Sequence, residues 1–455
     1  IQLAAKRLQD KHDGDLVYGD SVTGDTPMLL RNKITGEITF KQIDDMMVDT
    51  EWKSYNRFKL GEEGRTEKQQ RKAENYEIYT SEGWSDIVRV IRHKTVKKMY
   101  RINTHTGMVD VTEDHSLLDE ELNILKPKDA VIGTNLCHNY PVFEKKNIHL
   151  KDILEYIETI ETKTVSEKEA FIYGFFYGDG SCGKYRCPSG LKYSWALNQK
   201  SMKTSELLKL LCETVFNDTF AINNTIESSG VYKTVPRCGN IKKYVEMFRD
   251  SCYNKDRLKI IPDRFLNGDY DSRLAYFAGY YMADGSKCKN EKTKCIRMDN
   301  KGKIGSAMLF YLTKSLGLNV SVNTRSDKLD IIRLTATSGS QRKPSNSIKK
   351  IEFIGMSDDF VYDIETKVGN FNTGFPLIVK NTDSCYIHFP QFDKADKLWD
   401  FCLEVEEDIS SIFPPPMRMA FEEVIYWQFL ILTKKRYMYL DCGRDGIVAE
   451  KIGKK

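Results

Sequence analysis

The spacing of apolar residues predicts helices and strands in different regions of the chain. Near the start, apolar residues recur three and four positions apart, which predicts a helix over residues 1–12. Short runs of β-branched and aromatic residues, separated by turn residues such as 32–36, predict strands over 84–91 and 100–104. Residues 61–72 are highly charged and nearly free of apolar side chains, which predicts a mobile loop.

One further pattern occurs twice in the chain. Residues 173–181 match residues 278–286 at a glycine, at an Asp-Gly-Ser ending, and in their aromatic character. A single copy would fit an ordinary Asp-Gly hairpin turn, but two copies, 284 − 179 = 105 residues apart, favour a repeated structural unit. As helix ends, the copies would pack through small residues one turn apart, with a glycine cap after each aspartate. Asp179 and Asp284 would then meet, which predicts a divalent cation between them.

A second feature is a hexapeptide split into two halves. Residues 18–20 and 382–384, read together, give Tyr-Gly-Asp-Thr-Asp-Ser, and 381 − 21 + 1 = 361 residues lie between them. If the halves form one hairpin turn, an insertion of this size must hold its own ends together. The insertion starts with serine, ends with asparagine, and is followed by threonine.

Charge separates the middle of the chain from the rest. Residues 180–259 hold 14 Lys and Arg against 7 acids, and residues 285–350 hold 15 against 4. The net charge of the whole chain is +4, so the remainder carries 4 − 7 − 11 = −14. This distribution predicts a polyanionic partner for the middle, with a solvated charged surface as the alternative.

Several classes of protein are disfavoured by what the sequence lacks. The 11 cysteines are scattered without a zinc-binding spacing, which favours free thiols. No apolar run approaches a membrane span, and the start has neither a signal peptide nor an initiator methionine. We therefore expect a soluble fragment of a longer intracellular protein, cytoplasmic or nuclear, with no membrane partner.

The joined hexapeptide resembles the metal-binding motif of family B DNA polymerases. That resemblance implies that Asp20 and Asp383 face catalytic magnesium ions. Downstream, we expect a strand over 385–389 and a helix over 394–411. Residues 429–437 resemble the polymerase segment that contacts primer-template DNA, which implies DNA contacts for Lys434, Lys435, Arg436 and Tyr437. The family's other metal-binding aspartate and nucleotide-binding helix are missing, so the fragment is not expected to polymerise DNA by itself.

The interruption resembles an intein, a segment that removes itself from a protein by splicing. The likeness covers roughly residues 21–135 and 351–382, and its motifs are residues 21–26, 107–115, 361–366, 369–371 and 379–381. It implies that the Ser21 hydroxyl attacks the carbonyl of Asp20 and converts a peptide bond into an ester. His115 would protonate or hydrogen-bond the leaving amide nitrogen, and Thr112 would steady the same bond.

The resemblance also assigns the later steps. Thr382 would take over the acyl group with help from Asp363, and Asn381 would cyclise to cut the chain before Thr382, without a cofactor. Inteins usually carry histidine just before this asparagine and often another in the preceding motif, but this chain has Lys380 and Gly369. A lysine cation donates hydrogen bonds but does not act as a base near neutral pH. We therefore predict that cyclisation is slow or uses Lys380 as a donor.

Residues 140–350 resemble the two-motif LAGLIDADG homing endonucleases. The repeated aspartates carry this likeness, with further family-like segments at 257–262 and 312–318. It implies a monomeric endonuclease that cuts double-stranded DNA, in which Asp179 and Asp284 hold Mg²⁺ and Lys259 supports the attacking water. Basic residues would contact phosphates.

Together, these resemblances predict a mixed fold and a splicing function. We expect an all-β, horseshoe-like splicing domain with an inserted α+β, pseudo-twofold endonuclease, flanked by α+β polymerase palm fragments. The expected parts are residues 1–20 (polymerase flank), 21–138 and 351–381 (splicing domain), 139–350 (endonuclease) and 382–455 (polymerase flank). Excision would join Asp20 to Thr382 and restore the polymerase motif. The alternatives are an endonuclease insertion that has lost splicing, and an insertion without catalytic activity.

Overall fold

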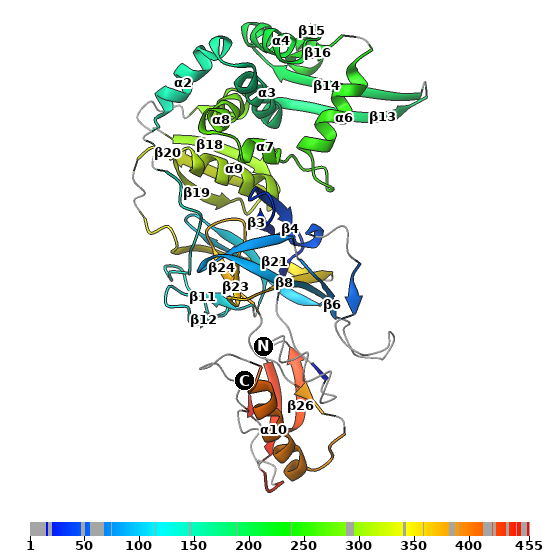
Figure 1. Cartoon of the computed structure of the whole chain (residues 1–455), viewed down its shortest axis with the longest axis vertical. Helices are drawn as coiled ribbons and strands as arrows, with labels where there is room; N and C mark the ends of the chain where they lie inside the picture. Colours follow the sequence, from blue (N-terminus) through cyan, green and yellow to red (C-terminus); the bar gives the residue numbers. More distant parts are fainter. Residues whose placement is uncertain are drawn as a thin grey trace.

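Three parts follow one another along the long axis of the computed structural model (Figure 1). A part rich in helices lies at one end, a curled β structure lies in the middle, and a small part containing helix α10 lies at the other end. The structure describes residues 15–16, 21–46, 51–54, 68–73, 75–113, 115–144, 146, 148–188, 190–237, 239–287, 295–339, 343–357, 359–381, 387–389, 391–412, 421, 425–433, 436–442, 444–446 and 453–454.

The middle part is built from strands that come from both ends of the interruption. Its larger antiparallel sheet has 11 strands, and its main path runs β21-β9-β10-β2-β22-β8-β7-β3-β4, with β6 beside β8 and β5 beside β6. The strands are β2 (Val22–Thr23), β3 (Pro27–Asn32), β4 (Ile38–Gln42), β5 (Lys53–Ser54), β6 (Lys68–Arg71), β7 (Tyr76–Thr80), β8 (Gly83–Lys94), β9 (Lys97–Thr104), β10 (Met108–Thr112), β21 (Ile348–Ser357) and β22 (Phe360–Thr366).

A smaller sheet repeats this interleaving. Its order is β12-β11-β24-β23, so late strands again pair with early ones. The strands are β11 (Leu117–Leu118), β12 (Ile124–Leu125), β23 (Asn370–Asn372) and β24 (Ile378–Lys380), and a 3-10 turn, η1 (Ile43–Asp45), follows β4. Residues near 22 and near 380 therefore belong to one β structure, although the helical part separates them in sequence.

The helical part contains the same series of elements twice. Each half has a long helix, two strands, a second helix and two more strands, and its sheet order is β13-β14-β16-β15 or β17-β18-β20-β19. The first half is α3 (Val165–Asp179), β13 (Gly180–Cys187), β14 (Gly190–Gln199), α4 (Met202–Phe216), β15 (Phe220–Thr225), α5 (Ile226–Ser229), β16 (Val231–Pro236) and α6 (Ile241–Cys252). The second half is α7 (Asp263–Leu266), α8 (Tyr270–Asp284), β17 (Ser286–Lys287), β18 (Cys295–Lys301), α9 (Lys303–Ser315), β19 (Asn319–Thr324) and β20 (Ile331–Thr337), and α2 (Leu150–Glu158) with η2 (Ile160–Thr162) precede both.

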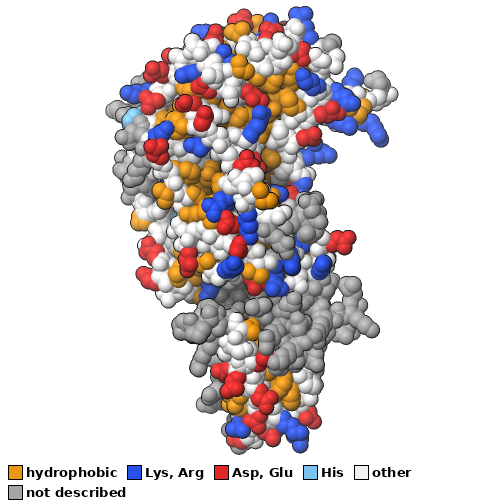
Figure 2. All heavy atoms as spheres, in the orientation of Figure 1, with side chains coloured by type: hydrophobic (Ala, Val, Ile, Leu, Met, Phe, Trp, Pro, Cys, Tyr) orange, Lys and Arg blue, Asp and Glu red, His pale blue; other side chains and the backbone are white. Residues whose placement is uncertain are grey.

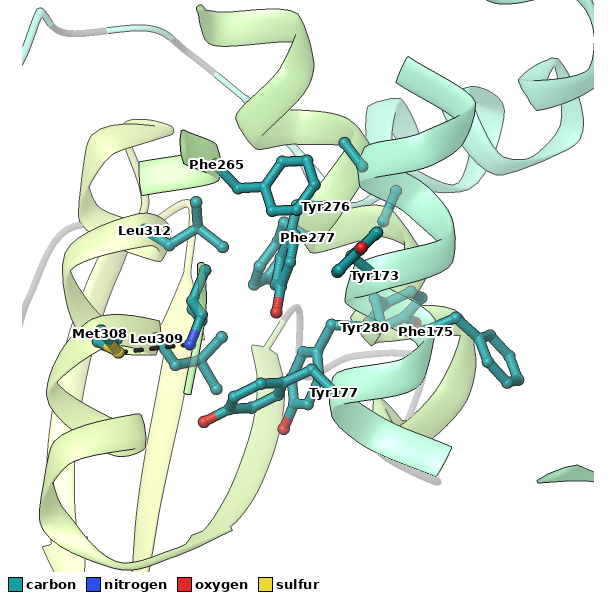
Figure 3. Close-up of a cluster of buried hydrophobic side chains, with 14 of the residues drawn as sticks. Tyr173, Phe175, Tyr177, Phe265, Tyr276, Phe277, Tyr280, Met308, Leu309 and Leu312 are labelled. Atoms are coloured by element: carbon teal, nitrogen blue, oxygen red, sulfur yellow. Dashed lines mark hydrogen bonds between the residues drawn. The ribbon is translucent and has the colours of Figure 1, made fainter. Parts of the chain in front are cut away.

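Helices α3 and α8 pack together at the centre of this part. A Cβ atom added to Gly174 would lie 1.9 Å from the carbonyl oxygen of Tyr276, and one added to Gly279 would lie 2.0 Å from that of Phe171. Only glycine permits such close backbone contact. Figure 3 shows aromatic side chains of both helices gathered in the surrounding apolar core, where Tyr177 and Tyr280 contact edge to face.

The third part joins the two flanks of the interruption. Strand β1 (Asp15–Leu16) pairs antiparallel with β25 (Ile387–His388), so residues on either side of the interruption are hydrogen-bonded neighbours. Helix α10 (Ala395–Ser410) follows, and a sheet of order β26-β27-β28 is formed by β26 (Ile425–Thr433), β27 (Arg436–Cys442) and β28 (Gly453–Lys454).

Most predicted elements that fall on described residues agree with the structure, and one predicted loop does not. Strands predicted over 84–91 and 100–104 lie within β8 and β9, and the helix predicted over 394–411 is α10. The helix predicted over 1–12 lies outside the described residues. The prediction of a loop over 61–72 is wrong for Lys68–Arg71, which form β6. Backbone pairing with β8 and a 2.8 Å hydrogen bond from Arg89 Nη1 to Gln70 Oε1 stabilise this strand without apolar side chains.

The fold is therefore a mixed α/β structure with a curled antiparallel sheet, as the sequence predicted in outline. In the part of the chain that the structure describes, no helix is both long enough and apolar enough to cross a membrane.

Candidate functional sites

The serine that begins the interruption lies beside the end of strand β10. Val22 pairs with Val111, so the register places Ser21 opposite Thr112. The backbone N–H of Thr112 donates to the Ser21 carbonyl oxygen at 3.1 Å, and the backbone N–H of Ser21 donates to Thr112 Oγ1 at 3.4 Å. This second N–H belongs to the peptide bond between residues 20 and 21. The Thr112 hydroxyl thus lies at the nitrogen that would leave if the preceding acyl group were transferred.

Strand β22 approaches the same serine from the other side. Val22 pairs with Tyr362, so continuing the register places Asp363 opposite Ser21. Asp363 is buried, and one of its carboxylate oxygens accepts a 2.8 Å hydrogen bond from the next backbone N–H. Ser21 is only 1% exposed, and its hydroxyl has no hydrogen-bond partner among the described residues. A buried hydroxyl without a hydrogen-bond partner is unusual in a native structure and is consistent with a chemical role.

The turn that follows β10, residues 112–116, holds both ends of the interruption. At its start it contacts Ser21, and within it the buried His115 donates its backbone N–H to the Thr112 carbonyl oxygen at 3.0 Å. At its end, the Ser116 carbonyl oxygen accepts the backbone N–H of Lys380 at 3.0 Å. This one short turn thus contacts the segment of 361 residues near both its beginning and its end.

The last residue of the interruption is buried beside Gly369. Asn381 is 9% exposed, and its backbone N–H donates to the Gly369 carbonyl oxygen at 3.1 Å. Gly369 has a φ of +84°, a conformation that favours glycine. A Cβ atom at this position would lie 3.7 Å from Asn381 Oδ1. The position where inteins often carry histidine therefore faces the side-chain amide of Asn381.

Some predicted site residues are not described. Asp20, Thr382, Asp383, Lys434 and Lys435 lie outside the described residues. The backbone of Arg436 and Tyr437 forms the start of β27, opposite Thr433 and Ile431.

The repeated aspartates meet as the sequence predicted. Asp179 is the last residue of α3, and Asp284 is the last residue of α8. Burial and the nearby Asp284 carboxylate together raise the pKa of Asp179 from 3.8 to about 6, against the opposing effect of Lys259 and Lys200. Burial also raises the pKa of Asp284. The pair is thus electrostatically unfavourable when both groups are ionised.

The glycines after these aspartates cap the helices for a different reason from the one expected. Gly180 and Gly285 have φ values of −78° and −61°, so neither adopts the left-handed conformation of a glycine cap. Instead, a Cβ atom at Gly180 would lie 2.5 Å from the Phe176 carbonyl oxygen, and one at Gly285 would lie 2.3 Å from that of Tyr281. Lack of space rather than a positive φ requires glycine here.

Lys259 lies at the end of α3, next to the carboxylate pair. Its ammonium donates to the carbonyl oxygens of Phe176 and Gly180 at 2.8 Å and of Tyr177 and Gly178 at 3.1 Å. A cation at this position offsets the negative end of the helix dipole. Burial lowers the pKa of Lys259 to about 8, although the aspartates oppose this shift. In this arrangement the ammonium is bound to backbone carbonyls, which fixes the strand and helix ends around Asp179.

The donor atoms at this site fit a hard divalent cation. Two carboxylates of raised pKa converge at paired helix ends, and oxygen ligands of this type are those that Mg²⁺ prefers. Among the described residues there is no cluster of three or more Asp, Glu, His or Cys side chains that would form a complete protein cage. A cation at this site would therefore also bind water or substrate oxygens.

Basic side chains cover the strands that extend from this site. Figure 2 shows Lys and Arg side chains over the projecting end of β13 and β14. Lys184, Arg186 and Lys192 are exposed there. This surface accounts for part of the positive charge that the sequence placed in the middle of the chain.

Sequence patterns did not reveal the buried ion pairs between the β structure and α9. Arg101, Asp110 and Lys303 are all less than 9% exposed and are linked by contacts of 2.7 Å. Charged residues separated by almost 200 positions give no pattern that would predict their pairing.

Comparison with known sequences relates this chain to DNA polymerases. Residues 347–452 match the family described as DNA polymerase family B. A DNA polymerase of Acanthamoeba polyphaga mimivirus is 41% identical over 460 residues, which cover 97% of this chain and 25% of that protein. A putative DNA polymerase of Frog virus 3 is 48% identical over 80 residues, or 18% of this chain and 8% of that protein. The chain thus spans about a quarter of the mimivirus polymerase.

Two solved structures also match part of this chain, with low TM-scores. A variant of the homing endonuclease I-DmoI matches 38% of this chain and 90% of its own, with 18% identity and a TM-score of 0.29. The transcription factor IIB Mvu mini-intein matches 27% of this chain and 70% of its own, with 19% identity and a TM-score of 0.21. The chain therefore contains a region that matches the DNA polymerase family B.

Proposed function

We propose that the chain is a self-splicing precursor with an embedded DNA endonuclease. Residues 21–381 excise themselves and join Asp20 to Thr382, which restores the Tyr-Gly-Asp-Thr-Asp-Ser motif of a family B DNA polymerase. The proposed parts are residues 1–20 and 382–455 (polymerase flanks), 21–138 and 351–381 (splicing domain) and 139–350 (endonuclease).

The 112–116 turn carries this proposal. It contacts Ser21 at one end and Lys380 at the other, so both proposed cleavage points lie at one site. Reactions between groups held together in this way gain a large effective concentration compared with free reactants. An insertion without chemistry would have no need to bury Ser21, His115 and Asn381 around the same turn.

The pairing of the flanks supports the ligation. Leu16 pairs with Ile387, so residues 17–20 and 382–386 lie between two strands that are already hydrogen-bonded. After excision these 4 + 5 = 9 residues would form the loop of one hairpin. The family match begins at residue 347, but β21, β22 and β24 pair with strands from the first 125 residues and β23 pairs with β24, so we assign them to the splicing domain.

The first step exchanges an amide for an ester. Ser21 Oγ bonds to the carbonyl carbon of Asp20, the carbon–nitrogen bond breaks, and the hydroxyl proton passes to the released amine of Ser21. Thr112 Oγ1 holds that nitrogen, and the buried His115 supplies or orients the proton.

The later steps release the insertion. The Thr382 hydroxyl takes the acyl group from Ser21, assisted by Asp363, and returns a proton to the serine oxygen. The side-chain nitrogen of Asn381 then bonds to its own backbone carbonyl carbon and frees the amine of Thr382. That amine attacks the ester, which forms the new peptide bond and restores the threonine hydroxyl. No water, cofactor or oxidant is consumed.

The embedded domain is proposed to cut double-stranded DNA as a monomer. Asp179 and Asp284 would hold Mg²⁺ ions, which, when bound, polarise the phosphodiester and activate water. Lys259 fixes the helix ends that carry these carboxylates, and the exposed basic strands bind phosphates. The restored polymerase would bind primer-template DNA through residues 434–437 and Mg²⁺ through Asp20 and Asp383.

The extent of the sequence matches also supports an insertion. The Frog virus 3 polymerase aligns over 80 residues, close to the 455 − 361 = 94 residues outside 21–381, whereas the mimivirus polymerase aligns over 460. Some relatives thus match a length close to that of the flanks alone.

Intact mass after expression tests the proposal. Splicing predicts two products, of 361 and 94 residues, and Ser21→Ala together with Asn381→Ala should leave one chain of 455 residues. A parent chain that stays at full length but cuts DNA would instead support the alternative, an endonuclease that has lost splicing. A parent chain with neither activity would support a catalytically inert insertion.

A further inference from the structure

A lysine of the endonuclease-like part is inserted between the strands that hold the first splice junction. Lys303, the first residue of α9, is 7% exposed. Its ammonium donates to Thr23 Oγ1 at 2.8 Å and to Asp25 Oδ1 at 2.5 Å, and it lies 2.7 Å from Asp110 Oδ2. Since an ammonium has three N–H groups, these three partners use all of its donors.

One of the two acidic partners of this lysine is fully enclosed. Asp110 is 2% exposed, and its two carboxylate oxygens accept 2.7 Å hydrogen bonds from Arg101. Despite burial, the two cations lower the pKa of Asp110 to about 2, and the acids raise the pKa of Lys303. Removing one member would leave a buried charge without full compensation, which is strongly unfavourable.

The residues that Lys303 binds lie next to the reacting ones. Thr23, which lies on β2, is two positions from Ser21. Asp110 is two positions from Thr112 on β10. Strand β2 has only two residues, and one residue pair joins it to β10. Two further residue pairs join β2 to β22, and the Lys303 contacts add a side-chain link between β2 and β10 close to Thr112.

We infer that Lys303 is a positioning residue for the first splicing step, supplied by the endonuclease-like part. By tying β2 to β10, it holds the Ser21 amide at the Thr112 hydroxyl. This inference rests on the proposed splicing function. It predicts that the splicing domain depends on the inserted domain through one defined contact.

Two other lysines of the endonuclease-like part provide matched controls. Lys255 lies 2.8 Å from Asp44, beyond the end of β4, and contacts neither β2 nor β10. Lys301 is 68% exposed and lies 3.7 Å from Asp330 at the surface. Lys255→Met tests for general loss of docking, and Lys301→Met tests for loss of a surface charge.

The experiment isolates the first step in the full chain. With Asn381→Ala and Thr382→Ala in every variant, the chain stays intact before residue 382 and the acyl group remains on Ser21, where hydroxylamine cleaves the ester. We expect Lys303→Met to slow this cleavage by about 10- to 100-fold, as misplaced groups do in other reactions, and Lys303→Arg to recover part of it. In Lys255→Met and Lys301→Met, the rate of hydroxylamine cleavage should remain within about twofold of the rate in the chain that keeps all three lysines.

A second measurement separates positioning from folding. In a Ser21→Ala background, release of the C-terminal flank needs only Asn381, so Lys303→Met should leave its rate unchanged. Equal losses at both junctions, or unchanged hydroxylamine cleavage, would overturn the positioning role. A parent that hydroxylamine does not cleave would overturn the proposed splicing function, and the inference with it.

Discussion

The splice-junction cluster and the carboxylate pair are built in opposite ways. Ser21, Thr112 and Asp363 are each no more than 3% exposed and come from three segments distant in sequence. Asp179 and Asp284 end two helices that share one sequence pattern, and both remain partly exposed. A reaction of the chain upon itself can take place in a closed site, whereas a reaction on DNA needs access for a large polyanion.

The strongest test of this comparison is to remove each site alone. Asp179→Asn or Asp284→Asn should lower DNA cleavage by at least about 100-fold, because a carboxylate ligand is lost, and should leave splicing unchanged. Ser21→Ala should abolish splicing and leave DNA cleavage unchanged, because no other hydroxyl occupies its place. Gel analysis of plasmid cleavage and intact mass measure the two activities in the same preparation. Cleavage that survives in both aspartate variants would contradict the assigned metal site.

The sequence revealed the second of these sites more completely than the first. The repeat placed both aspartates at helix ends because local patterns encode helix ends and small residues. Their mutual effect on the pKa of Asp179 followed from that geometry. The reason for Gly180 did not, since the carbonyl that excludes a side chain there is visible only in three dimensions.

At the splice junction, residue types were predicted but contacts were not. The motifs identified Ser21, His115 and Asn381, yet only strand pairing shows that the 112–116 turn joins both ends. Ion pairs such as Lys303 with Asp110 depend on packing between remote segments, and no sequence period records them. The polar strand β6 was missed because backbone pairing, not apolar alternation, stabilises it.

Substitutions in the contact between α3 and α8 should lower the free energy of unfolding more than substitutions at the surface of either site. Gly174→Ala or Gly279→Ala would force a methyl group against a carbonyl oxygen of the other helix and should cost about 3 kcal/mol of unfolding free energy. Urea unfolding of the full chain with Ser21→Ala and Asn381→Ala measures this loss without splicing. Gly339→Ala is the control, because its nearest neighbour would be a side-chain oxygen 3.6 Å away. Equal stability of all three variants would contradict the close helix packing.

Titration of Asp179 should show how far its partner sets the site's charge. Its raised pKa, about 6, means that the folded protein binds an extra proton between about pH 4 and 6, so metal-free stability falls as pH rises through this window. Cation binding should weaken below about pH 6. In Asp284→Asn the pKa of Asp179 should fall but stay above its ordinary value, because burial, the larger cause, remains. Carbon-13 NMR of labelled aspartate carboxyls measures the pKa of Asp179 in the parent and in Asp284→Asn. If the pKa is the same in both, the two carboxylates do not interact electrostatically.

The smallest expected effect concerns the C-terminal end of the splice-junction cluster. Lys380 lies where inteins usually carry histidine, next in sequence to Asn381, and its backbone N–H donates to the Ser116 carbonyl oxygen. If its ammonium donates to the carbonyl or the leaving group during cyclisation, Lys380→Ala should slow release of the C-terminal flank by about tenfold. Lys380→Arg, which keeps a donor, should lose less, and Lys367→Ala, at a surface lysine paired with Asp86, should have no effect. Mass spectrometry in a Ser21→Ala background measures the rate at which the C-terminal flank is released. If Lys380→Ala releases it as fast as the parent, the closed site needs no hydrogen-bond donor at this position.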